Sequence, residues 1–139
     1  MTATRLIAPA KLTLSLRVTG VRADGYHLID AEMVSLDLHD ILVIDTTRRG
    51  LAAVGPFAAG IPLDDSNLVA RALRLADHPA YVTIDKQIPH GGGLGGGSTD
   101  AATALRWAGF GSGADDLARA AMLGADIPFL TTESALALG

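Results

Sequence analysis

The sequence predicts a single α+β domain, in which strands come mostly first and helices mostly later. The first third of the chain alternates between apolar and polar residues, whereas the second half shows helical spacing that ends at glycines. Over 139 residues, 49% are hydrophobic and 19% charged, which suffices for one hydrophobic core. Because only 4% are aromatic, we expect that core to consist of leucine, valine, isoleucine and alanine. No repeat or linker divides the chain.

The first predicted strand begins at Lys11. Apolar side chains then alternate strictly with polar ones, at Leu12, Leu14, Leu16 and Val18. Such alternation is typical of a half-buried strand with one polar face. We therefore expect Lys11, Thr13 and Ser15 to lie together on the exposed face.

A turn and further extended segments follow. Ala23-Asp24-Gly25 predicts a turn between two extended runs, of which the second, Ile29–Leu38, is less regular. Asp40 is expected to interrupt this run before a buried strand at Ile41–Ile44. Residues 49–63 are rich in glycine, alanine and proline, so we predict a loop there with one weak strand.

Three helices are predicted from spacing and end signals. Ser66 can cap a helix over residues 67–76, and Tyr81–Asp85 then reads as a strand with Val82 and Ile84 on one side. A helix over residues 98–108 should end at Gly109, and one over 115–123 at Gly124. The tail, residues 129–138, is expected to begin a final strand.

A glycine run precedes the second of these helices. Six of the seven residues from Gly91 to Gly97 are glycine. Glycine adopts backbone conformations closed to other residues and lets a ligand approach the amides closely, at a high entropic cost on ordering. The first N–H groups of a helix lack internal partners and carry a positive partial charge. The run and the helix start therefore predict a phosphate-binding loop, to which Ser98 and Thr99 add hydroxyls that can bond a phosphate oxygen.

Other interpretations of the run are weaker. A flexible linker is seldom placed between a strand and a strongly formed helix start. No Gly-Lys-Ser/Thr sequence closes the run, so it is not a P-loop. Gly91, Gly93 and Gly96 match the dinucleotide-binding pattern, but the acids at 115 and 116 fall at a predicted helix start and not after a second parallel strand.

Composition excludes several classes of function. The net charge is −4 with no basic stripe, which argues against nucleic-acid binding. Cysteine is absent, which excludes disulfides and thiolate chemistry. No signal peptide is visible and no apolar stretch reaches the roughly 20 residues of a membrane helix, so we expect a cytoplasmic protein. The spacing of His39, His78 and His90 suggests no metal site within the protein.

Candidate catalytic and substrate residues lie outside the run. Asp126 follows a helix stop at Gly124 and precedes Pro128, so its carboxylate is held rigidly and could accept a proton from an attacking hydroxyl. From spacing alone, a turn aspartate that bonds its own backbone is the better interpretation. Lys11 could hold that carboxylate ionised or steady the transferring group, although a solvated lysine on the strand face is favoured on the same grounds.

Tyr26 and His27 follow the predicted turn. An exposed tyrosine beside a histidine can stack on a base and bond its edge. A tyrosine in this position is more often a hydrophobic anchor beneath the turn. The pair alone therefore leaves both interpretations open.

Four segments together resemble a known enzyme family. They are Ala8-Pro9-Ala10-Lys11-Leu12, Arg22-Ala23-Asp24-Gly25-Tyr26-His27, the stretch from Ile88 and Pro89 through the glycine run to Ser98-x-Asp100-Ala101-Ala102, and Leu123-Gly124-Ala125-Asp126-Ile127-Pro128. In this order they resemble the 4-diphosphocytidyl-2-C-methyl-D-erythritol kinases of the galactokinase, homoserine kinase, mevalonate kinase and phosphomevalonate kinase (GHMP) superfamily. The resemblance covers nearly the whole chain.

The resemblance implies a fold, a reaction and roles for residues. The fold would be ribosomal protein S5 domain 2-like, with an unusual left-handed crossover. The reaction would be ATP-dependent phosphorylation of the 2-hydroxyl of the cytidyl substrate in the non-mevalonate route to isoprenoid precursors, with Mg²⁺ accompanying ATP and no protein ligand to it predicted. Asp126 would be the base with Lys11 as partner, and Tyr26 and His27 would hold the cytosine. The ATP phosphates would be held by Pro89, Gly91, Gly92, Gly93, Leu94, Gly95, Gly96, Gly97, Ser98 and Thr99.

Two departures from the family pattern matter. Thr13 stands where the family usually has asparagine, and a hydroxyl cannot offer the same paired donor and acceptor to a substrate. The family also has a second domain of comparable size, whereas residues 1–139 correspond to the N-terminal ATP-binding domain alone. The alternatives are therefore an ATP-binding fragment without catalysis that needs a partner for the second domain, or a GHMP kinase for another alcohol. The sequence predicts no oligomeric state.

Overall fold

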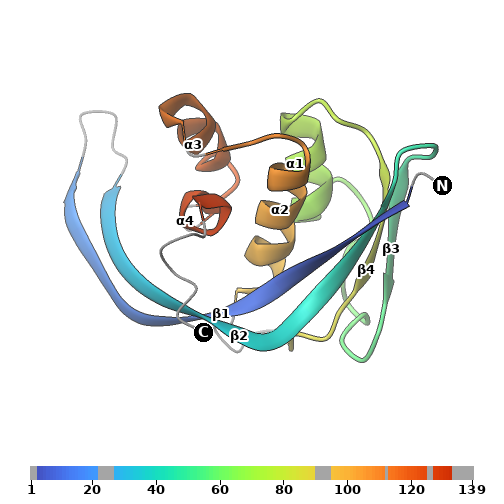
Figure 1. The fold of residues 1–139 in the computed structure, drawn as a ribbon, viewed down its shortest axis with the longest axis horizontal. Coiled ribbons are helices and arrows are strands. Elements are labelled where there is room, and N and C mark those ends of the chain that lie inside the picture. Colours follow the sequence, from blue (N-terminus) through green and yellow to red (C-terminus); the bar gives the residue numbers. More distant parts are fainter. Residues whose placement is uncertain (1–2, 22–26, 90–94, 112, 125–126, 133–139) are drawn as a thin grey trace.

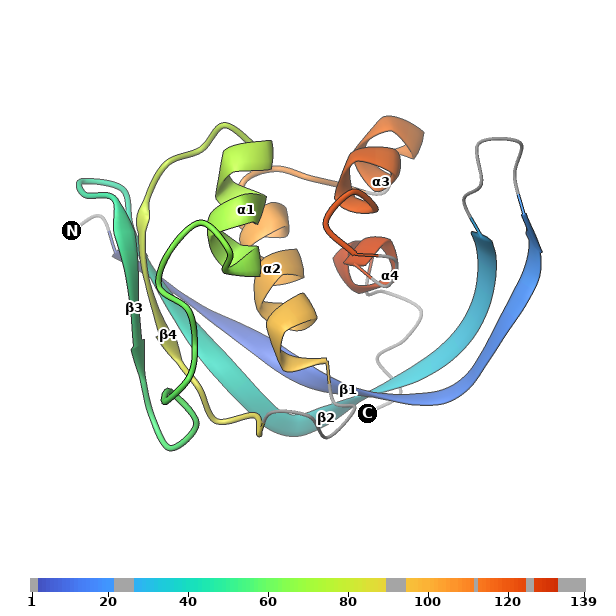
Figure 2. The same ribbon diagram turned by 180° about the vertical axis from the view of Figure 1, so that it is seen from behind.

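The computed structural model is one mixed β-sheet with helices packed against it (Figures 1 and 2). It describes residues 3–21, 27–89, 95–111, 113–124 and 127–132. The strands are β1 (Ala3–Val21), β2 (His27–Asp45), β3 (Gly50–Val54) and β4 (Tyr81–Asp85), in the order β1-β2-β4-β3. β1 pairs with β2 and β2 with β4 antiparallel, whereas β3 and β4 are parallel. The α+β class predicted from the sequence is confirmed.

The long β1–β2 hairpin departs from strict alternation. Its register shifts between Pro9 and Lys11, so Ala10 and Lys11 are both buried while Leu12 is 42% exposed. The prediction that Lys11 lies on the exposed face and Leu12 in the core is therefore wrong, because a bulge turns the following residues over. The turn predicted at residues 23–25 lies outside the described residues, but the strands on either side of it pair as expected.

β2 also runs further than predicted. It continues without a break through Asp40, which was expected to interrupt it and instead is fully buried. Beyond Asp40 the strand alternates, with Leu42 and Ile44 in the core. A charged residue can occupy such a position only when buried partners satisfy it, and the segment directly after β4 supplies them.

The parallel strands are joined through helix α1 (Leu68–Leu75), which lies between them in sequence. The weak strand predicted within residues 49–63 is β3, and the strand at Tyr81–Asp85 is confirmed, with Val82 and Ile84 buried. The cap of α1 is Asn67 and not Ser66: the Asn67 side chain accepts from the Val69 amide at 2.8 Å, while Ser66 bonds Asp64.

Three helices follow β4. They are α2 (Gly96–Trp107), α3 (Ala114–Ala120) and α4 (Ile127–Thr132). α2 begins two residues earlier than expected, inside the glycine run. The strand predicted from residue 129 is wrong over residues 129–132, which are helical; Ile127 and Leu130, three positions apart, are both buried. Among the described residues, no helix has the length and hydropathy to span a bilayer.

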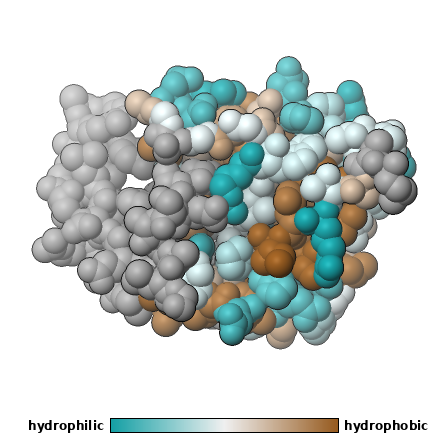
Figure 3. Space-filling view, in the orientation of Figure 1, coloured by the Kyte–Doolittle hydropathy of each residue, from teal (hydrophilic) through white to brown (hydrophobic). Residues whose placement is uncertain are grey.

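The core lies between the sheet and the helices. Helix α1 contributes Val69, Ala72 and Leu73, and α2 contributes mostly alanines, which allow it to approach the strands closely. The described core is thus aliphatic apart from Phe110 and the partly buried Trp107, as the composition predicts. On the face shown in Figure 3, hydrophobic residues gather in the right half of the view, where Figure 1 shows the strands.

Candidate active site

The start of α2 has the geometry of an anion-binding helix end. Its cap, Gly95, has φ 67° and ψ 28°, a left-handed conformation that favours glycine. The first helical hydrogen bond runs from the Thr99 amide to the Gly95 carbonyl at 2.7 Å. The amides of Gly96 and Gly97 therefore precede the first helical hydrogen bond and lie at the positive end of the helix dipole. This arrangement suits a phosphate group.

The first two glycines of α2 differ in their surroundings, which yields a matched test. A Cβ on Gly96 would lie 3.2 Å from the Lys86 ammonium and from an Ile88 methyl, whereas one on Gly97 would have its nearest contact 3.8 Å away. We expect Gly96→Ala to displace the helix start and destabilise the fold by about 1–3 kcal/mol. Gly97→Ala should cost less than about 0.5 kcal/mol. Urea unfolding of both variants measures this, and equal losses would contradict the close packing at Gly96.

Behind the helix start lies a buried ionic cluster of Asp40, Lys86 and Asp100. The Lys86 ammonium donates to Asp40 Oδ2 at 2.6 Å and to Asp100 Oδ2 at 3.0 Å. Asp40 Oδ1 accepts from the backbone amides of Gln87 and Ile88 at 2.8 and 2.9 Å. All three charged side chains are at least 95% buried. The cluster ties β2, the segment after β4 and the first turns of α2 together.

Burial and charge act on the cluster in opposite directions. Burial alone would lower the pKa of Lys86, but Asp100 and Asp40 together outweigh it, so the pKa is raised and the ammonium stays charged. Burial raises the pKa of Asp100 well above its usual range, and the adjacent Asp40 carboxylate raises it further, against the opposing effect of Lys86. The Asp100 carboxyl group therefore favours its protonated form.

A pocket of about 190 Å³ adjoins the helix start. Gly97, Lys86 and Asp100 line it together with Ile84 on β4 and residues from the approach to α1 and its first turn. The complete lining is Ile61, Pro62, Ser66, Asn67, Leu68, Val69, Ile84, Lys86, Gly97 and Asp100. Because most of the lining is apolar, the pocket suits the flat, weakly polar part of a ligand whose anionic part lies at the start of α2.

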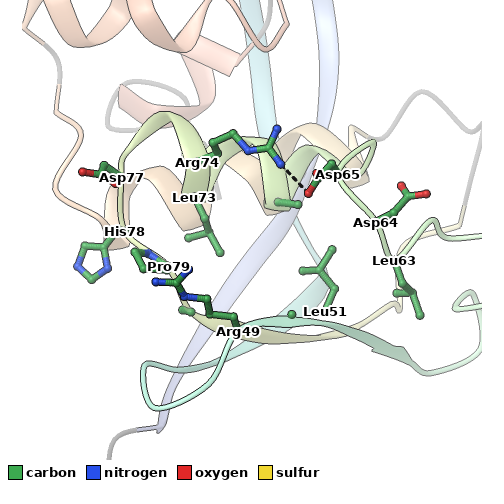
Figure 4. A pocket seen from close by; sticks show the side chains of 13 residues that line it. Arg49, Leu51, Leu63, Asp64, Asp65, Leu73, Arg74, Asp77, His78 and Pro79 are labelled. Carbon is green, nitrogen blue, oxygen red and sulfur yellow. Dashed lines mark ion pairs between the residues drawn. The ribbon is translucent and has the colours of Figure 1, made fainter.

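A larger pocket of about 410 Å³ is lined in part by Ala70, Leu73 and Arg74 of α1 (Figure 4). Its lining residues come from the start of β3, from α1 and the segments on either side of it, and from the residues just before β4. They include Arg74 and Asp65, which form an ion pair of 2.6 Å. No residue of α2 lines it, so its size alone does not make it the reaction site. The smaller pocket is the one that shares residues with the anion-binding helix end.

Comparison with known proteins decides the family. The model of the GHMP kinases N terminal domain matches residues 66–132, which include α1, β4 and α2. The 4-diphosphocytidyl-2-C-methyl-D-erythritol kinase of Paracoccus denitrificans is 47% identical over 126 residues, covering 89% of this chain and 44% of that protein. The chain belongs to the GHMP kinase family.

Further proteins that are similar to this GHMP kinase domain are also kinases. The enzyme of the same name from Herminiimonas arsenicoxydans is 43% identical, over 88% of this chain and 47% of that protein. A crystal structure of 4-(cytidine 5'-diphospho)-2C-methyl-D-erythritol kinase superposes with a TM-score of 0.60 at 38% identity, over 91% of this chain and 48% of that one. A homoserine kinase structure from Listeria monocytogenes, at 22% identity and a TM-score of 0.52, shows the shared fold alone. The chain spans somewhat less than half the length of these curated relatives.

The GHMP kinase domain places some of the predicted site residues and not others. Gly95 caps α2 and Gly96 and Gly97 are its first residues, with Ser98 half-buried and Thr99 buried in the helix, and their phosphate-binding role stays a prediction. Pro89 precedes them, half-buried. Predicted residues Gly91, Gly92, Gly93, Leu94, Tyr26 and Asp126 lie outside the described residues, as do the side chains of Thr13 and His27.

Lys11 differs from its predicted setting. It is buried on β1 rather than solvated, and its ammonium donates to Ser35 Oγ at 2.5 Å. A buried lysine is far more constrained than a surface one, so the simple interpretation as a solvated strand residue is wrong. Its proposed partnership with Asp126 remains a prediction.

Sequence reasoning missed the buried cluster. Asp100 was noted only as part of the glycine segment, Asp40 only as a break in a strand, and Lys86 not at all. The usable signal was an aspartate, Asp40, whose neighbours two positions away on the same strand face, Leu38 and Leu42, are both apolar, because an ionised carboxylate on a buried face needs buried donors or a cation. The identity of that cation depends on three-dimensional pairing across 46 residues.

Proposed function

We propose that this chain binds ATP with its phosphates at the start of α2, and transfers the γ-phosphate to the 2-hydroxyl of 4-diphosphocytidyl-2-C-methyl-D-erythritol. The observation that carries the proposal is the juxtaposition of the helix start at Gly95–Gly97 with the largely apolar pocket beside it. The first holds an anion through backbone amides, and the second has the size and lining for a nucleotide base.

The charges of the described residues support binding by backbone dipoles. Lys86, the cation nearest to the helix start among these residues, already donates to Asp40 and Asp100. It can therefore contribute little to a phosphate directly. The backbone amides of Gly96 and Gly97, strengthened by the helix dipole, are the groups that we propose bind the phosphate oxygens. Mg²⁺ bound to ATP would neutralise part of the phosphate charge.

The chemical step requires a base for the acceptor alcohol. We assign this role to Asp126, which takes the hydroxyl proton as the oxygen attacks the γ-phosphorus and ADP departs. Lys11 would keep that carboxylate ionised or stabilise the transferring group. Tyr26, His27 and Thr13 would contact the cytidyl substrate. Support for the substrate comes from relatives that are 42–47% identical to this chain and bear the name 4-diphosphocytidyl-2-C-methyl-D-erythritol kinase. We place the reaction in the cytoplasm.

The test separates binding from chemistry. Calorimetry measures ATP binding, and mass spectrometry measures product after single-turnover incubation with Mg-ATP and a panel of alcohols: the cytidyl substrate, homoserine, mevalonate and galactose. We expect product from the cytidyl substrate alone. Product from another alcohol would indicate a GHMP kinase of different specificity, and ATP binding without product would indicate a nucleotide-binding chain that needs a second domain. Absence of ATP binding would overturn the proposal.

A further inference from the structure

The two carboxyl groups around Lys86 are satisfied very unequally. Asp40 receives three hydrogen bonds, from the Lys86 ammonium and two backbone amides. Asp100 receives one at 3.0 Å on Oδ2, and its buried Oδ1 has no hydrogen-bond partner among the described residues. An ionised carboxylate in this setting would carry negative charge on an oxygen that no donor reaches, which is costly in a medium of low polarity.

The charge count of the cluster leads to the same difficulty. With both carboxyl groups ionised, two negative charges would share one ammonium, and all three side chains are at least 95% buried. The surplus negative charge would lie in the first turns of α2, where it would oppose the attraction of the helix dipole for an anion. Lys86 lies 2.6 Å from Asp40 but 3.0 Å from Asp100, so Asp40 is the better ion-pair partner.

We propose that Asp100 is a neutral carboxylic acid in the folded protein. Because Asp100 keeps its proton, the cluster of Asp40, Lys86 and Asp100 has no net charge beneath the end of α2 that we propose binds phosphate. The proton lies on Oδ2 and is donated toward the Asp40 carboxylate. Oδ1 is then a carbonyl oxygen, for which the lack of a partner costs much less than for an anion. Asp100 is thus a positioning residue, and its effect on nucleotide rests on the proposed function.

The groups that face Asp100 support this assignment. Burial and the Asp40 carboxylate favour the protonated form, and Lys86 is the group that opposes them. Of the other elements packed against α2, α1 brings the uncharged Asn67 and Leu68 to the shared pocket, and α4 contains no titratable residue. β1 brings Lys11, which donates to Ser35.

Infrared spectroscopy tests the protonation state without any ligand. The wild type minus Asp100→Asn difference spectrum, recorded above neutral pH where ordinary carboxyl groups are ionised, should contain the C=O stretch of a protonated acid, shifted in D₂O. Asp116→Asn, which removes a carboxylate that accepts from the Gly111 amide, should give only carboxylate bands. Carboxylate bands alone in the Asp100 difference spectrum would overturn the proposal.

If Asp100→Asn does not fold, ¹³C NMR of aspartate-labelled wild type replaces the difference spectrum. One carboxyl carbon should keep the chemical shift of a protonated acid at neutral pH, and a spectrum in which all aspartates are ionised would contradict the assignment.

The consequence for nucleotide is measured as ATP affinity against pH. As pH rises through the pKa of Asp100, the wild type gains a buried negative charge near the phosphates and should lose roughly tenfold in affinity. Asp100→Asn stays neutral, so its affinity should lack this loss. Equal pH profiles for the two proteins would refute the positioning role. Failure of both to bind ATP would instead refute the proposed function and leave the infrared result standing.

Discussion

Replacing Lys86 with methionine is expected to destabilise the fold by about 3–5 kcal/mol, the largest effect on stability that we predict for a single side chain. Methionine keeps most of the aliphatic stem of lysine, so the loss comes from the charge and its hydrogen bonds rather than from packing. The Asp40 carboxylate, which is fully buried, would lose its only cation among the described residues and keep neutral donors, among them the amides of Gln87 and Ile88. Urea unfolding monitored by circular dichroism measures the loss.

Two further variants make this result specific. Arg74→Met removes an ion pair that is equally short, with 2.6 Å between the Arg74 guanidinium and Asp65 Oδ1. The side chains of Arg74 and Asp65 are 64% and 78% exposed. We expect a change of no more than about 1 kcal/mol there, because water screens the pair. In Lys86→Met combined with Asp40→Asn, the loss should be smaller than the sum of the two single losses, since neither charge remains. A Lys86→Met loss as small as that of Arg74→Met would contradict the importance of the buried cluster.

Local patterns predicted those elements whose stability is also local. The strand at Tyr81–Asp85 and the helix that begins at Gly96 are both bounded by strong turn and cap residues and have clear periodicity. Residues 129–132 were misassigned to a strand because they are short and apolar, and short apolar runs fit either structure. Packing of Ile127 and Leu130 into the core selects the helix.

Long-range effects account for the larger errors. The register shift after Pro9 turns Lys11 inward, and the alternating sequence contains no feature that predicts this shift. Asp40 remains in a continuous strand because Lys86 reaches it from a segment 46 residues later. Sequence alone therefore predicted a helix that follows the glycine run, but not the cluster beneath its start or the pocket beside it, both of which form from segments distant in the chain.

The largest effect on activity is expected for Asp126→Asn, which should lower the rate of phosphoryl transfer by about 10²- to 10⁴-fold. Asparagine keeps the size of the side chain but cannot accept the proton of the attacking hydroxyl. Asp126 lies outside the described residues, but its neighbour Ile127 is fully buried at the start of α4, and its amide donates to the Gly124 carbonyl at 3.2 Å. Since α4 packs against α2, the backbone beside Asp126 is anchored to the helix that we propose binds ATP.

Single-turnover rates and ATP affinities distinguish a lost base from a damaged binding site. For Asp126→Asn, ATP affinity should match the wild type while the rate falls, because the base acts on the acceptor alcohol and not on the nucleotide. Asp115→Asn provides the matched control: it makes the same chemical change at an exposed position in the first turn of α3 and should leave both quantities unchanged. If Asp126→Asn transfers phosphate as fast as the wild type, Asp126 is not the base, and the proton of the alcohol must leave by another route.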